Sequence, residues 1–484
     1  INQLQIRQKN GFHHLTYENF ELTSEPGIPQ LPYEIVHFSD NNLRIDSIVI
    51  TQTDYVKVDG EFKLYPAQKP QILSMKKVDF QPLSLHKTGL KTFCPGHAVE
   101  VLHGGNFNDH FINGYRLFPL KYNVRTGELF FLKNITLGIS TRPGSLTKKR
   151  SANHPVYQKI VSHLAGTPQA NHAAPISSES TVDYLIITSV KLSSYFIPLQ
   201  EWKMKKGLRT EIVTTEWIAE NYSGRDIQEK IRNLIKDYHQ NKATVWVLLG
   251  GDTNIIPDRK AWAFDCEANY ASGENDIPCD LYFSDLDGNW DADHDDIFGE
   301  VEDNIDIYPD VFVGRAPVEN IQEAEAFVNK TLTYEKAVNT DYQTNALFLA
   351  QVLWKDPYTD SGESKNLIDE LYLPDQFDPV NKLYESKSNA SKNNIIEKIL
   401  SGMNIINHDG HAWYSIMSVG QGSLGYTDMA NLNNKDKYGF IYSIGCWPAA
   451  MDKHAVAEDF ITNPEGGGIA FIGNSRYGWG SPGN

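Results

Sequence analysis

The pattern that most constrains the fold begins at residue 183, where short apolar runs start to alternate with amphipathic segments. The run DYLIITS is followed by YFIPLQEWKMKKG, which has helical spacing and ends at a glycine. LRTEIVTT and TVWVLLGG are two further apolar runs, and the amphipathic stretch SGRDIQEKIRNLIKDYHQ lies between them. Continuous apolar strands that alternate with helices are typical of a parallel sheet covered on both faces.

The same alternation continues along the rest of the chain. Strands are predicted at DVFVGR, NALFLAQV, MNIINHDGH, FIYSIGC and GGIAFIGNS, and helices at VENIQEAEAFVNKTLTYEKA, SKNNIIEKILSG and HAVAEDFI. The sequence therefore predicts two parallel-sheet α/β subdomains, one over residues 183–338 and the other over residues 339–484.

The N-terminal region, residues 1–150, has a different pattern. LRIDSIVITQTDYVKV and KYNVRTGELFFLKNITLGIS alternate as strands do, and no helical periodicity of useful length occurs, so we predict an all-β domain. Residues 151–182 are rich in Ser, Ala, Pro and His and are predicted to be a linker. The basic cluster at residues 148–150 is a candidate processing site, with a solvated charge run as the alternative.

Length and charge narrow the function. A chain of 484 residues is too long for one compact core, which agrees with several domains. The net charge of -17 disfavours a nucleic-acid partner. No apolar run approaches the roughly 20 residues that cross a bilayer, so no transmembrane segment is predicted.

The start at Ile1 predicts a processed or trimmed N-terminus. Cys266 and Cys279 are close in sequence, and a disulfide, a metal site and two free thiols remain alternatives for them.

Two of the predicted strands end in the same way. MNIINHDGHAW places His411 after Gly410, and FIYSIGCW places Cys446 after Gly445. Ligands bind outside the carboxyl ends of strands in open parallel sheets, so we expect both residues at one edge. An imidazole beside a thiol assists formation of the nucleophilic thiolate. Structural roles for both residues are the alternative, and His408 and His454 are also near in sequence.

Taken together, the motifs resemble the gingipain-type cysteine peptidases, whose core is caspase-like. The resemblance rests on DYLIIT, EWKMKKGLRTEIVTTEWI, VWVLLGGDTNIIP, YPDVFVGRAPV, INHDGHAW, IYSIGCW and NPEGGGIAFIGNSRYGWG, in this order. It implies that Cys446 is the nucleophile and His411 the catalytic histidine. It also implies an oxyanion hole formed by the backbone N–H groups of Ala412 and Cys446, with Ala412 in place of the family's glycine.

The resemblance implies further site residues. Asp356 is expected to orient His411, with Asp360 and Glu363 as alternatives. Lys365 falls near the position where well-studied family members carry an acid that selects basic substrates, so it is expected at the substrate site. Trp479 is expected to wall the substrate pocket, with an ordinary core or surface tryptophan as the alternative.

A carboxylate-rich stretch, SDLDGNWDADHDDIFGEVEDNIDIYPD, predicts a structural calcium site. Calcium takes about six to eight oxygen ligands, and carboxylates that alternate in a turn can wrap around it. An exposed acidic loop is the alternative. The resemblance also implies structural calcium. The expected ligands are Asp285, Asp287, Asp291, Asp293, Asp295 and Glu300.

The fold class expected overall is α/β, with an N-terminal all-β prodomain followed by a caspase-like catalytic domain of two parallel-sheet subdomains. The expected function is a secreted or cell-surface cysteine endopeptidase in zymogen form, acting on proteins or peptides through a Cys-His dyad. The segment PGIPQLPYEIV resembles the start of the family's prodomain, which is expected to act as an intramolecular inhibitor. The alternatives are a sortase-like transpeptidase of a secretion system and a non-catalytic, calcium-stabilised surface or binding module.

Overall fold

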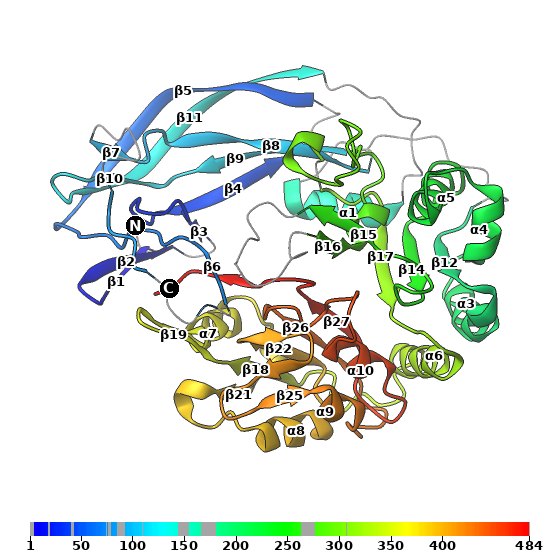
Figure 1. Cartoon of the computed structure of the whole chain (residues 1–484). Coiled ribbons are helices and arrows are strands. Elements are labelled where there is room, and N and C mark those ends of the chain that lie inside the picture. Colours follow the sequence, from blue (N-terminus) through cyan, green and yellow to red (C-terminus); the bar gives the residue numbers. More distant parts are fainter. Residues whose placement is uncertain are drawn as a thin grey trace. The chain divides into compact units, whose positions relative to one another are not determined.

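The computed structural model describes residues 4–17, 20–39, 43–73, 75, 79–84, 92–108, 110–143, 154–165, 181–262, 276–305 and 307–483. The chain divides into two compact units (Figure 1). The first unit comprises residues 1–70 and 79–175, and the second comprises residues 71–78 and 176–484. A short N-terminal segment thus belongs to the C-terminal unit, which the sequence did not predict.

The first unit is built from antiparallel strands. Their order is β1-β2 in one sheet, β5-β11-β10-β7 in a second and β3-β4-β9-β8 in a third. The strands are β1 (Leu4–Lys9), β2 (Phe12–Tyr17), β3 (Glu21–Leu22), β4 (Pro32–Phe38), β5 (Leu43–Val58), β7 (Phe93–Cys94), β8 (Val99–Phe107), β9 (His110–Leu117), β10 (Leu120–Asn123) and β11 (Leu129–Pro143). Leu15, Leu31, Leu64 and Leu129 form its core. The predicted all-β character of the N-terminal region is confirmed.

One helix corrects the predicted linker. Residues 155–165 form α1 (Pro155–Ala165), which buries Tyr157 and Val161. The Tyr157 ring packs edge-on against Phe107 of β8, with ring centroids 5.6 Å apart. This packing orders a stretch whose composition alone is typical of a linker. The basic cluster at 148–150 lies outside the described residues, and so does Cys266.

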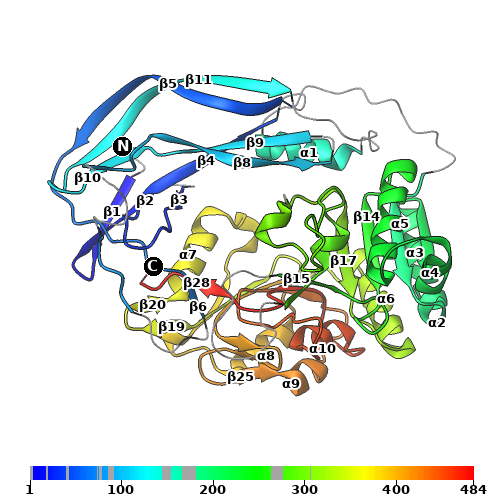
Figure 2. The same cartoon turned by 45° about the horizontal axis from the view of Figure 1, so that its top comes forward.

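The second unit contains two parallel sheets, as predicted. The first has the order β13-β12-β14-β17. Its elements are β12 (Tyr184–Thr188), α2 (Val190–Ser193), α3 (Ile197–Lys205), β13 (Thr210–Thr214), α4 (Thr215–Asn221), α5 (Ile227–Lys242), β14 (Trp246–Gly250) and β17 (Phe312–Ala316). Between β14 and β17 the chain forms the antiparallel pair β15 (Arg259–Trp262) and β16 (Asp276–Cys279), followed by the acidic loop. The helices α3 and α4 lie beside β13, and Figure 2 shows α4 next to α5.

The second parallel sheet has the order β21-β18-β22-β26-β27. Its elements are α6 (Ile321–Glu335), β18 (Ala346–Ala350), α7 (Ser361–Leu371), β21 (Asn381–Tyr384), α8 (Lys392–Ser401), β22 (Ile405–Asp409), α9 (Tyr426–Ala430), β26 (Gly439–Ser443), α10 (Val456–Thr462) and β27 (Gly468–Gly473). Short antiparallel strands follow some of these: β19 (Val352–Lys355), β20 (Tyr358–Asp360), β23 (Ala412–Trp413), β24 (Ile416–Ser418) and β25 (Ser423–Gly425). The sequence predicted every strand of this sheet except the edge strand β21.

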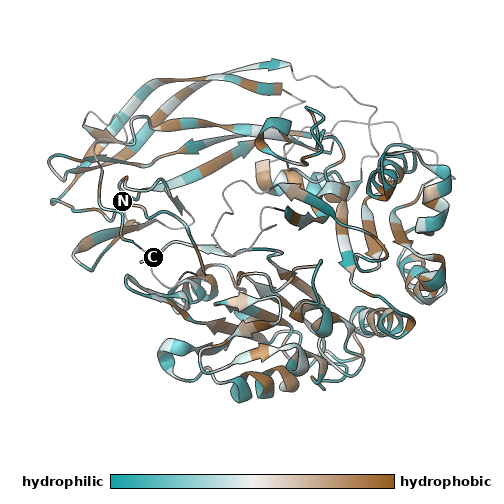
Figure 3. Ribbon diagram, in the orientation of Figure 1, coloured by the Kyte–Doolittle hydropathy of each residue, from teal (hydrophilic) through white to brown (hydrophobic). Residues whose placement is uncertain are grey.

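One apolar core joins the two parallel sheets. Buried residues of both sheets, among them Ile186, Leu248, Leu347 and Ile441, belong to a single cluster together with Phe327 of α6. Figure 3 shows the apolar colouring concentrated on the strands of this unit, while the helices carry hydrophilic faces. The two predicted subdomains therefore pack as one compact unit. None of the described helices has the length and apolar character needed to span a bilayer.

Candidate active site

The loops that carry His411 and Cys446 lie side by side. The strands β22 and β26 are parallel neighbours, and His408 is opposite Ser443 in their register. His411 and Cys446 each come the same number of residues after this paired position. A Cβ atom on Gly445 would lie 2.6 Å from Ala412 Cβ and 3.0 Å from the Gly410 carbonyl oxygen. Only glycine fits such an approach, and the fold brings both predicted residues to one edge of the sheet.

Cys446 is fully enclosed. Its exposed fraction is 0%, and it belongs to an apolar cluster with Leu353, Trp354, Trp447 and Tyr477. The next residue, Trp447, has a φ of 68°, which is uncommon for a bulky side chain. Backbone strain of this kind concentrates at functional sites and requires firm surrounding packing. The Trp447 ring has that packing, since the Tyr477 ring meets it edge-on at 5.7 Å.

The His411 ring is held by backbone groups. Its Nε2 lies 3.2 Å from the Leu353 carbonyl oxygen, and its backbone N–H donates to Gln351 Oε1 over 2.7 Å. Nδ1 is buried and makes no complete hydrogen bond with the described residues. Burial lowers the pKa of His411, while hydrogen bonding to the backbone of Leu353 and Leu73 opposes this. The ring is therefore neutral near pH 7 and can accept a proton.

The other two histidines near this edge interact with other groups. His408 is buried, with Nδ1 2.8 Å from Ser443 Oγ and Nε2 2.8 Å from the Ser418 carbonyl oxygen. Burial lowers its pKa to about 4. His454 is exposed at the surface and pairs with Asp459 over 3.0 Å. His411 is thus the histidine that accompanies Cys446.

The structure corrects the expectation for Asp356. This residue is exposed between β19 and β20, and the nitrogen that it was expected to orient faces the Leu353 carbonyl instead. Asp360 caps α7 by accepting from the Gly362 N–H over 2.9 Å. Every residue has a backbone carbonyl, so the sequence cannot show which carbonyl will contact a histidine ring. A carboxylate side chain was therefore the only kind of partner that the sequence could suggest.

A short extended segment from the N-terminal part of the chain occupies this edge. The strand β6 (Gln71–Ile72) pairs antiparallel with β28 (Trp479–Gly480). The Leu73 N–H donates to the Gly478 carbonyl oxygen over 2.9 Å, and Trp354 Nε1 donates to the Met75 carbonyl oxygen over 2.9 Å. Leu73 is fully buried in the same apolar cluster as Cys446. No motif in the sequence predicted that this segment would lie at the candidate site.

The two expected substrate-binding residues lie in different places. Lys365 is buried on α7, where its Nζ lies 2.6 Å from Asn407 Oδ1 and 3.8 Å from Asp409 Oδ2. Its ammonium group is therefore committed to β22, which corrects its expected place at the substrate site. Trp479 lies on β28 opposite Ile72, beside the occupying segment.

Comparison with known proteins identifies the family. Residues 177–484 match the model of peptidase family C25. The chain belongs to this family. The predicted kinship with gingipain-type cysteine peptidases is confirmed.

The relatives of this family C25 chain are distant. Gingipain R1 of Porphyromonas gingivalis is 23% identical over 441 residues, which cover 89% of this chain and 41% of the relative. Gingipain R2 of the same species is 23% identical over 339 residues, or 68% of this chain and 41% of the relative. The crystal structure of the Arg-specific cysteine proteinase gingipain R is similar with 20% identity and a TM-score of 0.47, covering 63% of this chain and 65% of that one. The chain thus spans 41% of the length of these curated relatives.

The acidic loop of the C25 chain separates into two carboxylate groups. One consists of Asp285, Asp287 and Asp310, and the other of Asp291, Asp293 and Asp295. Within each group, one oxygen per residue lies within 4.8 Å of the others. Asp310 was missed because it comes from the far end of the loop. Glu300, an expected ligand, is in neither group.

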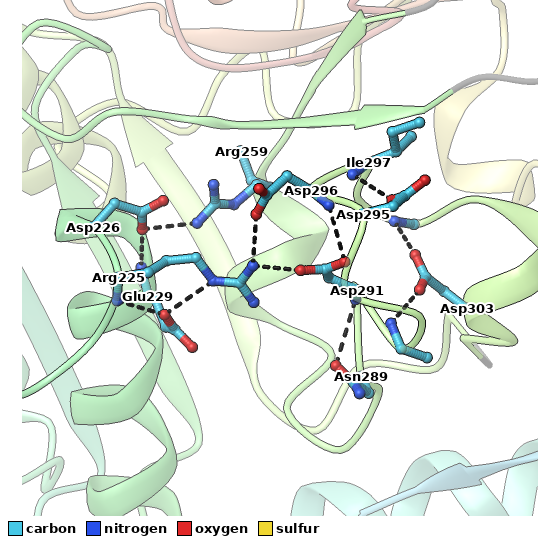
Figure 4. Close-up of polar contacts among 12 residues, drawn as sticks. Arg225, Asp226, Glu229, Arg259, Asn289, Asp291, Asp295, Asp296, Ile297 and Asp303 are labelled. Atoms are coloured by element: carbon cyan, nitrogen blue, oxygen red, sulfur yellow. Dashed lines mark hydrogen bonds and ion pairs between the residues drawn. The ribbon is translucent and has the colours of Figure 1, made fainter.

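Figure 4 shows how side chains already hold the second group. The Arg225 guanidinium contacts Asp291 and lies 3.2 Å from Asp296 Oδ1, and it lowers the pKa of Asp291. Asp303 accepts from the Gly299 N–H over 2.8 Å, and the Asp295 carboxylate accepts from the Ile297 N–H over 2.8 Å. An arginine therefore neutralises part of the crowded charge here. In the first group, the Asp285 carboxylate accepts from the Gly288 N–H and from Trp290 Nε1. The buried Arg232 guanidinium donates to the Asp285 carbonyl oxygen over 2.6 Å and interacts electrostatically with Asp285 and Asp310.

Proposed function

We propose that this C25 chain is a cysteine endopeptidase in which Cys446 and His411 perform the chemistry. The observation that carries the proposal is the contact between their two loops at Gly445, with a peptide segment lying across the same edge. His411 takes the proton of the thiol, and the thiolate attacks the peptide carbonyl carbon. His411 then gives this proton to the leaving amine, and a thioester forms. Water, deprotonated by His411, hydrolyses the thioester and restores the thiol.

The surroundings suit each step. A neutral imidazole is needed to accept the thiol proton, and burial favours that form of His411. The Leu353 carbonyl fixes the ring and stabilises the imidazolium that forms. The N–H groups of Ala412 and Cys446 are the proposed donors to the oxyanion, since both belong to the loops that meet at Gly445.

The described state is proposed to be a latent zymogen. Residues 71–73 pair with β28 in the manner of a peptide that adds a strand to a sheet edge. Leu73 and Cys446 are both fully buried, so no other peptide reaches the thiol while this segment stays. The N-terminal part of the chain would then act as an intramolecular inhibitor, and removal or displacement of the segment would be the activating step. We propose a secreted or cell-surface location for the enzyme.

A structural calcium ion is proposed for the acidic loop, with Asp285, Asp287 and Asp310 as its best ligands. These are hard oxygen donors, as calcium requires, and Asp285 and Asp310 are buried. The ion would stiffen the loop and take no part in the chemistry. Calcium should raise the melting temperature of the full chain and EDTA should lower it. The double variant Asp285→Asn with Asp310→Asn should abolish this difference, whereas Asp295→Asn should leave most of it. Equal melting temperatures with calcium and with EDTA in the wild type would refute the site.

The function is tested by labelling and by proteolysis. The full chain, before and after limited trypsin treatment, is incubated with iodoacetamide and with casein. We expect label at Cys446 and cleavage of casein after treatment, and loss of cleavage in Cys446→Ala and His411→Ala. Cys94→Ala serves as the matched control, because it removes another buried thiol. A treated chain that neither labels nor cleaves would favour a non-catalytic module. Transfer of the acyl group to an added amine, without hydrolysis, would favour a transpeptidase.

A further inference from the structure

We infer that the pocket next to Cys446 takes a leucine-like apolar side chain, so that the enzyme cleaves after large apolar residues. This inference rests on the proposed function and names its substrate class. The residue whose carbonyl is attacked is called the reacting residue below.

The direction and register of the segment identify Leu73 as the residue in the reacting position. Gln71 and Ile72 pair with Gly480 and Trp479, and the Leu73 N–H continues the pairing by donating to Gly478. The Leu73 backbone also lies near the His411 ring, where it raises the pKa of that imidazole. On the other side of Leu73, the Met75 carbonyl accepts from Trp354 Nε1. The segment thus crosses the site with backbone contacts on both sides of Leu73.

The side chain of Leu73 is enclosed by apolar neighbours. Its exposed fraction is 0%, and that of Trp354 is 3%. A Cβ on Gly480 would lie 3.0 Å from Leu73 Cδ2 and 3.0 Å from Trp354 Cη2. A leucine methyl group and the indole ring therefore both lie against the Gly480 backbone. Because Gly480 has no side chain, there is room at this position for a branched apolar side chain such as that of Leu73.

The apolar neighbours of Leu73 disfavour charged substrate side chains. The side chains clustered with Leu73 are Ile72, Leu353, Trp354, Cys446, Trp447, Ala450 and Tyr477, which include no carboxylate and no basic side chain. A buried arginine, lysine or aspartate would find no opposite charge among them, and burial of an unpaired charge is strongly unfavourable. The ammonium group of Lys365, which was expected at this site, is instead hydrogen-bonded to Asn407 and paired with Asp409. These apolar neighbours therefore favour an apolar side chain at the position of Leu73.

Quenched peptides of the series Gln-Ile-X-Ser-Met, which copies residues 71–75, test the preference directly. They are offered to the full chain after limited proteolysis, with casein as a substrate that does not depend on one residue type. We expect kcat/KM for leucine to exceed that for alanine by about tenfold or more, as filling an apolar pocket does. Arginine, lysine and aspartate should react on the order of a hundredfold more slowly than leucine.

The outcomes separate the two proposals. Cleavage of casein together with a preference for arginine or lysine would overturn the apolar pocket and leave the peptidase function intact. Absence of both casein and peptide cleavage, with no label at Cys446, would overturn the peptidase function itself. A preference for leucine or methionine would support both.

A second measurement needs no activation. The full chain with Leu73→Asp, Leu73→Arg or Leu73→Met is labelled with iodoacetamide, and the rate at Cys446 is followed by mass spectrometry. Aspartate and arginine should both expel the segment and raise the rate at least about tenfold. Methionine should keep it low, because it conserves the apolar volume. Leu83→Asp is the matched control, since Leu83 is 38% exposed in the same part of the chain. If the arginine variant stays as protected as wild type, the pocket accepts basic side chains and the inference is wrong.

Discussion

Acidification is expected to weaken the second unit through one buried histidine, His408. Its Nε2 faces the Ser418 carbonyl, which can only accept, so Nε2 carries the proton. Nδ1 is then the acceptor for the Ser443 hydroxyl, and Ser443 Oγ in turn accepts from the Gly445 N–H over 3.2 Å. Neutral His408 therefore anchors the loop that precedes Cys446.

The magnitude follows from the two pKa values of His408. Burial lowers its pKa from 6.5 to about 4 in the folded chain. Each pKa unit is worth about 1.4 kcal/mol, so the difference amounts to about 3 kcal/mol. Between these values the unfolded chain binds the proton and the folded chain does not. The stabilisation is therefore complete above about pH 6.5 and is lost as the pH falls towards 4.

The assay is urea unfolding followed by tryptophan fluorescence at several pH values from 7 to 4. All 9 tryptophans belong to the second unit, so the signal reports on that unit alone. His408→Gln should be less stable than wild type by about 1–2 kcal/mol at pH 7, because hydrogen bonds are lost. Towards pH 4 this gap should close and then reverse, since wild type loses about 3 kcal/mol and the variant has no proton to take up. The control is the exposed His454→Gln, and a gap for His408→Gln that stays constant over the whole pH range would refute the reasoning.

Two further substitutions test the site and the first parallel sheet. Gly445→Ala should force the loops of His411 and Cys446 apart, with a cost of about 1–3 kcal/mol in stability and a large loss of kcat/KM in the activated chain. Gly314→Ala, where a Cβ meets no atom within 4 Å, is its control, and normal activity of Gly445→Ala would contradict the packing. Asp183→Asn should lower the free energy of unfolding by about 1.5–3 kcal/mol, because Asp183 accepts from the backbone N–H and the guanidinium of Arg209. An unchanged urea midpoint for Asp183→Asn would show that this pair contributes nothing.

Much of the second unit could be predicted because its signals are local. A buried parallel strand such as β14 has a continuous apolar run, and a helix such as α5 has an amphipathic repeat. Each pattern is set by neighbours along the chain. The edge strand β21 was missed since NKLY is short and partly polar. The same local patterns placed His411 and Cys446 at the ends of β22 and β26, which are adjacent in the sheet.

The sequence by itself determined the alternation of strands and helices, the family, and the two residues at the strand ends. Only the tertiary structure decided that a carbonyl, not Asp356, meets the His411 ring, that Lys365 turns to β22, and that Leu73 fills the space beside Cys446. The physical reason is the range of the interactions. Periodicity records the burial of each element, whereas contacts between residues 71–75 and 478–480 depend on segments that are far apart in the chain and carry almost no pattern of their own.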